Sequence, residues 1–517
     1  MASTGLLVVS NVKQFAQSLR SIEKYVHSLY VHLNVPVTRA PIPSWGRLIS
    51  QLYVDSNVHF NNNVDMNILV TPLKQKGTFE NLNLRPIDMI FSDAHHPEVC
   101  EKLRQQLKIE KPTIYLADES VNDLSDYQQL EPEDKIKMYN NVVLGGTFDR
   151  IHLGHKIFLS QAVVRACCRL VVGVTTSQLT KSKTLSELIL PVDRRINDLQ
   201  TFLKEIDATL EYEVVPIDDP FGPTKSDPNM DMIVVSAETL RGGQKVNELR
   251  QENKLNTLDI FCIDLVEATD KGGPKENKVS SSNTRIDILG TRWRQPEFKS
   301  HLSAKPYIVG LTGGIASGKS KMAQRFANMG AFVMNCDKIA HEIYEPGQVC
   351  YNRMVEYFGK EILDNNGRID RTKLGPIVFA NPSELEKLNN IVWPELMAEV
   401  KRRIKILAEQ EKPPQVVILE AAVLLKAGWD QEVHEVWSMI VPPEEAVKRV
   451  VERNGLTEEE AKRRLASQLS NSEMVARSHV IFSSLWDTEF TLKQAEKAWL
   501  MLMQELKARN LQSSSSL

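Results

Sequence analysis

The stretch GLTGGIASGKS, which ends at Ser320, constrains the fold of this 517-residue chain more than any other feature. Gly313, Gly318, Lys319 and Ser320 satisfy the pattern G-x-x-x-x-G-K-[ST], between a strand-like apolar run and a helix-like run. Glycines let successive backbone N–H groups curl around phosphate oxygens, and the start of the following helix favours anions. We expect Lys319 to reach the β- and γ-phosphates of a nucleoside triphosphate and Ser320 to ligate Mg²⁺.

A second turn, GGTFDRIHLGH, also follows a strand-like run and precedes a helix-like one. Its two histidines, His152 and His155, fall in the first turn of that helix, and Gly154 between them lets a ligand approach the backbone. Side chains there face the positive end of the helix dipole and can donate hydrogen bonds to a leaving pyrophosphate. A pair of core or capping histidines is the alternative reading of this pattern.

Apolar runs such as RLVVGVT and QVVILEAAVLL alternate with helix-like stretches along most of the chain. This alternation predicts α/β domains with doubly wound parallel sheets, whose ligands bind at the carboxyl ends of the strands. We predict an N-terminal α/β region (1–137), a first catalytic domain (138–293), a linker (294–304), a second catalytic domain (305–510) and a disordered tail (511–517). The polar run DESVNDLSDYQQLEPEDK closes the N-terminal region, in which we find no catalytic motif.

The composition is that of an ordinary globular protein, with a formal net charge of −3 and basic residues spread along the chain. A long polyanion such as nucleic acid is therefore not an expected partner. No apolar run approaches the roughly 18 residues that suggest a membrane span. The six scattered cysteines favour reduced thiols. We expect a cytoplasmic protein, or one associated with mitochondria because the N-terminal twenty residues faintly resemble a presequence.

The quoted motifs resemble two known families. GGTFDRIHLGH, together with SSSNTR downstream, resembles the nucleotidyltransferase superfamily, and IDDPFGPT and VVSAETLRGGQKVNELR are similar to phosphopantetheine adenylyltransferases. GLTGGIASGKS, NCDKIAHEIYEPG, NNGRIDRTKLGPIVF and GLTEEEAKRRLASQL resemble dephospho-CoA kinases. The fused order resembles the bifunctional CoA synthase family. The implied folds are a Rossmann-like nucleotidyltransferase followed by a P-loop kinase.

For residues 138–293 the resemblance implies transfer of AMP from ATP to 4′-phosphopantetheine, with release of pyrophosphate. It implies that His155 acts on the transition state with His152 beside it, and that Thr147 contacts phosphate. The basic residue of the family corresponds to Lys181 or Lys183, and the choice between them stays open. The other substrate-binding residues that the resemblance implies are Gly146, Phe148, Arg195, Ser281, Ser282 and Arg285, with the arginines clamping phosphates.

For residues 305–510 the resemblance implies phosphorylation of the ribose 3′-hydroxyl of dephospho-CoA. It implies that Lys319 and Asp337 are catalytic, that Ser320 and Asp337 hold Mg²⁺, and that Arg371 binds the acceptor. Asp337 has an alternative as the cap of the helix that follows it. The remaining implied residues are Gly313, Gly314, Ile315, Ala316, Ser317, Gly318 and Arg464 for ATP, with Arg464 and Gln468 in a lid and Gln468 on the acceptor.

Two positions depart from the kinase pattern: Trp393 stands where many relatives have histidine, and Glu420 where aspartate is common. Two other functions remain open from sequence, namely a fused adenylyltransferase–kinase of NAD synthesis and a scaffold that senses nucleotides. The role of residues 1–137, the oligomeric state and direct transfer of dephospho-CoA between sites are left open as well. We expect residues 1–137 to fold separately and to be dispensable for chemistry.

Overall fold

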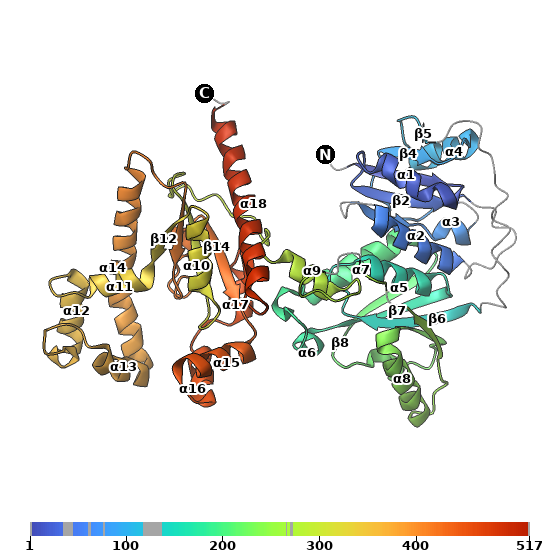
Figure 1. The fold of residues 1–517 in the computed structure, drawn as a ribbon. Coiled ribbons are helices and arrows are strands. Elements are labelled where there is room, and N and C mark those ends of the chain that lie inside the picture. The colour runs from blue at the N-terminus through green and yellow to red at the C-terminus, as the bar shows by residue number, and fades with distance from the viewer. Residues whose placement is uncertain are drawn as a thin grey trace. The chain divides into compact units, whose positions relative to one another are not determined.

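The computed structural model describes residues 3–34, 45–59, 64–75, 78–116, 137–264, 266–268 and 272–514 (Figure 1). It consists of two compact units, Met1–Thr284 and Arg285–Leu517, and each is described by itself. Each sheet is parallel and has helices packed against it, so the predicted α/β class is confirmed. Among the described residues, no helix has the length and apolar character needed to cross a membrane.

The first unit begins with a five-stranded sheet in the order β3-β2-β1-β4-β5. Its strands are buried apolar runs, as expected for a sheet covered on both faces. The strands are β1 (Thr4–Val9), β2 (Ser28–Leu33), β3 (Asp65–Ile68), β4 (Met89–Ser92) and β5 (Ile114–Tyr115). The helices are α1 (Phe15–Ile22), α2 (Trp45–His59), α3 (Thr71–Lys74) and α4 (Pro97–Leu107), with a 3₁₀ helix η1 (Val12–Gln14). The polar run that was expected to close this region lies entirely outside the described residues.

The second sheet of the same unit has the order β10-β9-β6-β7-β8. Both sheets have the same strand order: if the strands of each sheet are numbered from 1 along the chain, the order is 3-2-1-4-5, with the second sheet read from β8 to β10. The strands are β6 (Tyr139–Gly146), β7 (Ala166–Thr175), β8 (Glu211–Ile217), β9 (Met232–Ser236) and β10 (Asp259–Ile263). The helices are α5 (Leu153–Val163), α6 (Ser177–Thr180), α7 (Val192–Ile206), α8 (Leu240–Glu252) and α9 (Ser281–Ile288), with 3₁₀ helices η4 (Ser186–Leu188), η5 (Gly222–Lys225) and η6 (Ala237–Thr239).

The two sheets of this unit share one hydrophobic core. Helix α2 packs against α5, and Ile49 and Leu52 belong to the same buried cluster as Ile157 and Phe202. Burial of apolar surface is the dominant stabilising term of a fold. Each sheet has a further cluster of its own, but the cluster between them is buried only when the two sheets are together. Residues 1–137 and the second sheet therefore belong to one compact unit, whereas the sequence suggested a separate region.

The second unit carries a five-stranded sheet in the order β12-β13-β11-β14-β15. The strands are β11 (Tyr307–Gly313), β12 (Phe332–Asn335), β13 (Val416–Glu420), β14 (Glu435–Ile440) and β15 (Val480–Ser483). The helices before β13 are α10 (Lys319–Asn328), α11 (Cys336–Ile343), α12 (Val349–Phe358), α13 (Arg371–Ala380) and α14 (Pro382–Ala408), with η7 (Lys360–Ile362). Those after β13 are η8 (Trp429–Glu432), α15 (Pro443–Asn454), α16 (Glu458–Ala466), α17 (Asn471–Ala476) and α18 (Thr488–Ser514).

The segment expected to be a linker, residues 294–304, is bonded to this second unit. The Nζ of Lys299 donates to the carbonyls of Asp430 and Val433. Just before it, Arg292 forms an antiparallel bridge with Val480 and a buried ion pair with Glu435. The predicted tail also differs, because α18 continues through residues 511–514, while residues 515–517 lie outside the described part.

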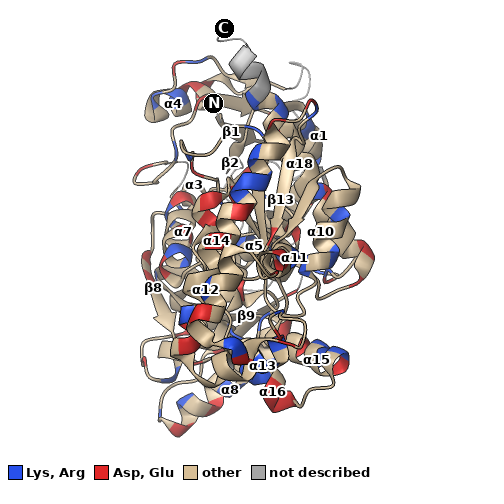
Figure 2. Ribbon diagram, turned by 90° about the vertical axis from the view of Figure 1, so that its left-hand side faces the viewer, with Lys and Arg blue, Asp and Glu red and all other residues tan. Residues whose placement is uncertain are grey.

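Charged residues of both signs are mixed along the helices (Figure 2). Helix α16, for example, has acidic residues in its first turn, Glu458, Glu459 and Glu460, and Arg463 and Arg464 in its last. This order suits the helix dipole. Proteins that bind nucleic acid usually present a stripe of basic residues, which differs from this mixture of charges. The expected absence of a nucleic-acid partner stays a prediction.

Candidate functional site

The histidine turn of the first unit lies directly after β6, the central strand of its sheet. The turn is tightly wound, with φ values of 49° at Phe148 and 53° at Arg150. Asp149, which is fully buried, holds it by accepting hydrogen bonds from Arg150 Nη1 at 2.8 Å and from the N–H of Leu190 at 3.1 Å. A Cβ on Gly146 would lie 3.0 Å from the Phe148 ring, so glycine is required for this close packing.

His152 and His155 are stacked at this turn, with ring centroids 3.8 Å apart. His152 is the N-cap residue of α5, and its Nε2 lies 3.3 Å from the Ser281 hydroxyl. The SSSNTR motif and the histidine motif are therefore brought together, and contact of Ser281 with substrate stays a prediction. Burial lowers the pKa of His155 well below its usual value, and the charges of His152 and Lys183 lower it further. His155 is thus neutral at pH 7 and can donate one hydrogen bond.

The two lysines between which the sequence left the choice open differ in their relation to His155. Lys183 is exposed, and its charge acts on the pKa of His155. Lys181 is also exposed and is the C-cap residue of α6. The choice between Lys181 and Lys183 as the basic residue of this site stays open.

Arg195 is hydrogen-bonded to the backbone of Thr147, a contact that the sequence did not predict. The guanidinium of Arg195, buried in the first turn of α7, donates to the carbonyls of Thr147 at 2.6 Å, Thr175 at 2.8 Å and Leu190 at 2.8 Å. Direct clamping of phosphate by Arg195 was expected, but its three nitrogens are each bonded to backbone. Arg195 instead braces the loop that presents Thr147, whose hydroxyl lies 3.1 Å from that of Thr175.

Helix α9 carries the other predicted residues, Ser281, Ser282 and Arg285. Arg285 is fully buried. The division between the two compact units falls inside this helix, just before Arg285. Contact of Ser282 and Arg285 with phosphate stays a prediction.

The second phosphate-binding turn follows β11, the central strand of the second unit. It begins α10 with Gly318 in the left-handed conformation at φ 88°, and a Cβ on Gly313 would lie 2.8 Å from the Met439 carbonyl. The turn borders a cavity of about 730 Å³. The predicted residues that line the cavity are Gly313, Gly314, Ile315, Ala316, Ser317, Gly318, Lys319, Ser320, Asp337 and Gln468.

Glu420, one of the two departures noted in the sequence, lies at the end of β13 next to this turn. Its Oε1 accepts hydrogen bonds from Lys319 Nζ at 2.8 Å and from Ser320 Oγ at 2.6 Å. Its Oε2 accepts one from Asn335 Nδ2 at 2.8 Å. Burial alone would raise the pKa of Glu420, but these hydrogen bonds outweigh it and the pKa is lowered. Glu420 therefore holds the lysine and the serine in place while no phosphate is bound.

Asp337 lies in the first turn of α11 and lines the cavity. The cap of this helix is Asn335, whose side chain accepts from the N–H of Lys338, so Asp337 does not serve as the cap. Sequence reasoning missed Tyr344, whose ring lies beside Arg371. The Arg371 guanidinium lies 5.6 Å from the Tyr344 ring, and burial, with the Asp337 charge, raises the pKa of Tyr344 to about 12.

The two residues expected in the lid, Gln468 and Arg464, lie in different places. Gln468 Oε1 accepts from the N–H of Ile315 at 2.8 Å, which places Gln468 beside the phosphate-binding turn, and its contact with the acceptor stays a prediction. Arg464 is exposed on α16, and its contact with ATP stays a prediction. Sequence reasoning also missed Arg449 of α15, which lines the cavity and donates to the Ala316 carbonyl at 3.3 Å. Trp393, the other departure, lies partly buried in α14.

The described residues contain no group of three or more His, Cys, Asp or Glu side chains arranged to hold a metal ion. The cavity of the second unit nevertheless offers hard oxygen donors, the hydroxyl of Ser320 and the carboxylate of Asp337, with Glu420 behind Ser320. Mg²⁺ commonly binds through one or two protein oxygens together with phosphates and waters. These residues therefore fit a magnesium ion that arrives with a nucleotide.

Comparison with known proteins shows that the two turns lie in regions that match two different families. Residues 307–485 match the family model described as dephospho-CoA kinase, and residues 143–286 match the model described as cytidylyltransferase-like. A dephospho-CoA kinase of Carboxydothermus hydrogenoformans is 38% identical over 187 residues, which are 36% of this chain and 90% of the relative. One from Geobacter sulfurreducens is 38% identical over 192 residues, 37% of this chain and 96% of the relative.

Among solved structures, a dephospho-CoA kinase from Campylobacter jejuni is 26% identical and is matched with a TM-score of 0.31, covering 39% of this chain and 98% of that one. Lys319, Asp337 and Glu420 all lie in the region that the kinase model matches. His152, His155 and Ser281 lie in the region that the cytidylyltransferase-like model matches. The chain therefore belongs to the dephospho-CoA kinase family, with a cytidylyltransferase-like domain preceding the kinase domain.

Proposed function

We propose that the chain catalyses two consecutive reactions of coenzyme A biosynthesis. The first transfers AMP from ATP to 4′-phosphopantetheine and yields dephospho-CoA and pyrophosphate. The second transfers phosphate from ATP to the ribose 3′-hydroxyl of dephospho-CoA. The observation that carries the proposal is the pair of phosphate-binding turns, each at the carboxyl end of a central parallel strand, β6 and β11, in regions that match the two families.

In the first reaction the 4′-phosphate of the acceptor attacks the α-phosphorus of ATP, and pyrophosphate leaves. Neutral His155 can donate a hydrogen bond to the phosphate oxygens on which charge develops. His152 stacks against it and is fixed by Ser281, which limits the rotation of both rings. We assign Thr147, with Lys181 or Lys183, to the phosphates, and Arg195 to support of the Thr147 loop. The acceptor supplies the attacking oxygen, so this step requires no nucleophilic side chain.

In the second reaction ATP phosphates enter the turn of residues 313–320. Lys319 then exchanges its bond to Glu420 for bonds to the β- and γ-phosphates. We assign Asp337, which lines the cavity, to orienting the 3′-hydroxyl and accepting its proton, and Arg371 to the acceptor. Mg²⁺ supplies charge neutralisation of the phosphates when bound, and Ser320 with Asp337 would hold it.

The proposed partners are thus small molecules: ATP, 4′-phosphopantetheine and dephospho-CoA. The assay that tests the proposal uses the full chain with Mg²⁺ and ATP, and supplies either 4′-phosphopantetheine or nicotinamide mononucleotide. Mass spectrometry should detect pyrophosphate release, dephospho-CoA and then CoA with the first acceptor alone. Formation of NAD with the second acceptor would favour the NAD alternative, and binding of ATP without any product would favour a nucleotide-sensing scaffold.

A further inference from the structure

We infer that the first sheet positions the catalytic turn of the second sheet through an ion pair between Asp65 and Lys156. Asp65 is the first residue of β3, and Lys156 directly follows His155 in the first turn of α5. The inference rests on the proposed adenylyl transfer and deepens it. It makes Asp65 and Lys156 positioning residues, which act on the reaction through His155.

The ion pair is short and is enclosed at its lysine end, whereas the Asp65 side chain is 43% exposed. Lys156 Nζ lies 2.5 Å from Asp65 Oδ1 and 2.8 Å from the Met66 carbonyl, and the lysine side chain is 11% exposed. Burial lowers the pKa of Lys156, while the charge of Asp65 opposes that shift. A buried cation without its partner is costly, so removal of Asp65 forces Lys156 to lose its proton or to move. Either change acts on the residue next to His155.

A wider network holds Asp65 itself in place. Arg85 donates to Asp65 Oδ2 at 2.9 Å and to Glu205 Oε1 at 3.0 Å, and Asn67 donates to Glu205 Oε2 at 2.9 Å. Glu205 lies in the last turn of α7. The first turn of α5 and the last turn of α7 are therefore fastened to the same strand, β3. Networks of this kind fix a geometry more tightly than separate pairs do.

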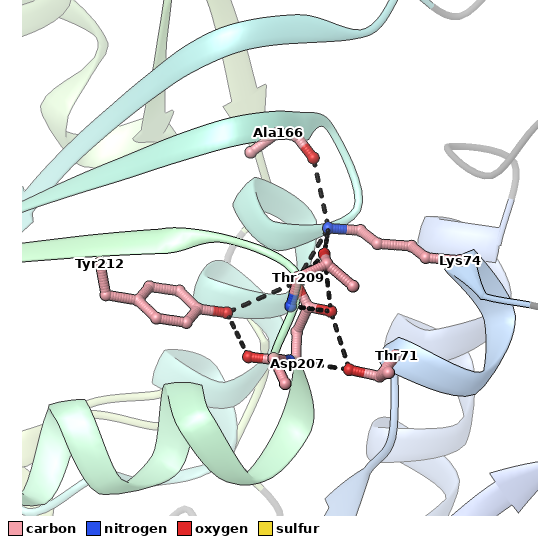
Figure 3. Close-up of polar contacts among 7 residues, drawn as sticks. Thr71, Lys74, Ala166, Asp207, Thr209 and Tyr212 are labelled. Carbon is pink, nitrogen blue, oxygen red and sulfur yellow. Dashed lines mark hydrogen bonds and ion pairs between the residues drawn. The ribbon is translucent and has the colours of Figure 1, made fainter. Parts of the chain in front are cut away.

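A second ion pair at the same interface, buried at both its lysine and its carboxylate, provides a comparison. Figure 3 shows Lys74, which donates to Asp207 Oδ2 at 2.9 Å, to the Ala166 carbonyl and to Thr209. Thr71 also donates to Asp207, and Tyr212 donates to the Asp207 carbonyl. This pair joins the two sheets at the C-terminal end of α7, whereas the Asp65 pair fastens the turn that carries His155.

The test compares Asp65→Asn with Asp207→Asn in the full chain, because each variant leaves one buried lysine without its carboxylate. For each protein, the melting temperature is measured together with kcat and KM of adenylyl transfer per folded molecule. The kinase step, supplied directly with dephospho-CoA, is the internal control. We expect Asp65→Asn to lower kcat by about 10- to 100-fold, the effect of a displaced catalytic group. Its KM should stay within about twofold of the wild type.

Asp207→Asn should lower the melting temperature at least as much, because Asp207 is fully buried, yet keep kcat near that of the wild type. Equal kcat values in the two variants would overturn the inference. Should Asp65→Asn not fold, Asp65→Glu decides the same question, because it keeps the charge and displaces the carboxylate by one methylene. Wild-type kcat in folded Asp65→Glu would then contradict the positioning role. An absence of adenylyl transfer in the wild type would instead refute the proposed function, so the two failures are distinguishable.

Discussion

The two sheets of the first unit have the same strand order, but the turn after the central strand differs between them. After β6 this turn presents Thr147 and the two histidines. After β1 the N–H groups of Ser10 and Asn11, which could have faced an anion, donate to the carboxylate of Asp93 at 2.8–2.9 Å. The first sheet thus fills the phosphate position with its own side chain. Topology alone does not define a nucleotide site, because the residues after the central strand decide it.

The comparison also suggests what the first sheet contributes. A chain that starts at Glu133 lacks this sheet and would expose Ile157 and Phe202 from the shared core. It would also leave Lys156 and Asp207 without their partners. We expect this truncation to lose cooperative unfolding of the first unit and all adenylyl transfer. Circular dichroism during thermal unfolding and a pyrophosphate-release assay measure the two effects.

Residues 285–517 should behave in the opposite way, because they form their own compact unit and bacterial relatives match this part over most of their length. This fragment should phosphorylate added dephospho-CoA.

A truncation from Glu133 that is folded and transfers AMP at the wild-type rate would contradict the dependence on the first sheet.

The second largest effect is expected for Lys319→Ala. The lysine acts on charge that develops during phosphoryl transfer, so its removal should slow the kinase step by about 10²–10³-fold. Adenylyl transfer lies in the other unit and should be unchanged, so dephospho-CoA should accumulate. Near wild-type formation of CoA would show that the phosphate-binding turn of the second unit is not the kinase site.

His155→Ala should affect the other reaction. A hydrogen bond made mainly in the transition state lowers kcat and kcat/KM together, and we expect a loss of about 10²-fold or more. The melting temperature should change little, whereas a histidine that only fills the core would lower it and leave kcat per folded molecule intact. Adenylyl-transfer kinetics, measured on the same preparation as thermal unfolding, distinguish the two roles.

The smallest effect concerns pH and the second unit. Burial lowers the pKa of His479 to about 4, and its Nδ1 accepts the N–H of Val436 on the neighbouring strand at 2.9 Å. Between the folded pKa and the usual value near 6.5, the unfolded chain binds the extra proton, so stability rises with pH in this window and is lost as pH falls. His479→Gln should reduce the dependence of the melting temperature of this unit on pH between about 4 and 6.5. An unchanged slope would mean that His479 does not contribute it.

The sequence predicted much of the fold and the two phosphate-binding turns, because apolar periodicity and glycine spacing are local signals. It could not predict the bond of Glu420 to Lys319, since the two residues are far apart in the chain and meet only where β13 lies beside β11. For a related reason the bonds of Arg195 to backbone carbonyls could not be predicted: a motif identifies a basic residue but not the carbonyl groups around it. The shared core of the first unit could not be predicted, because apolar periodicity indicates that Ile49 and Ile157 are buried but not that α2 packs against α5.

The claim that two separate sites act in sequence on one intermediate is tested most directly by mixing two inactive variants. Neither His155→Ala nor Lys319→Ala alone should convert 4′-phosphopantetheine and ATP to CoA at an appreciable rate. A mixture of the two should form CoA, because Lys319→Ala supplies dephospho-CoA and His155→Ala phosphorylates it. A mixture that makes no CoA, although each variant retains its remaining activity when assayed separately, would contradict the account.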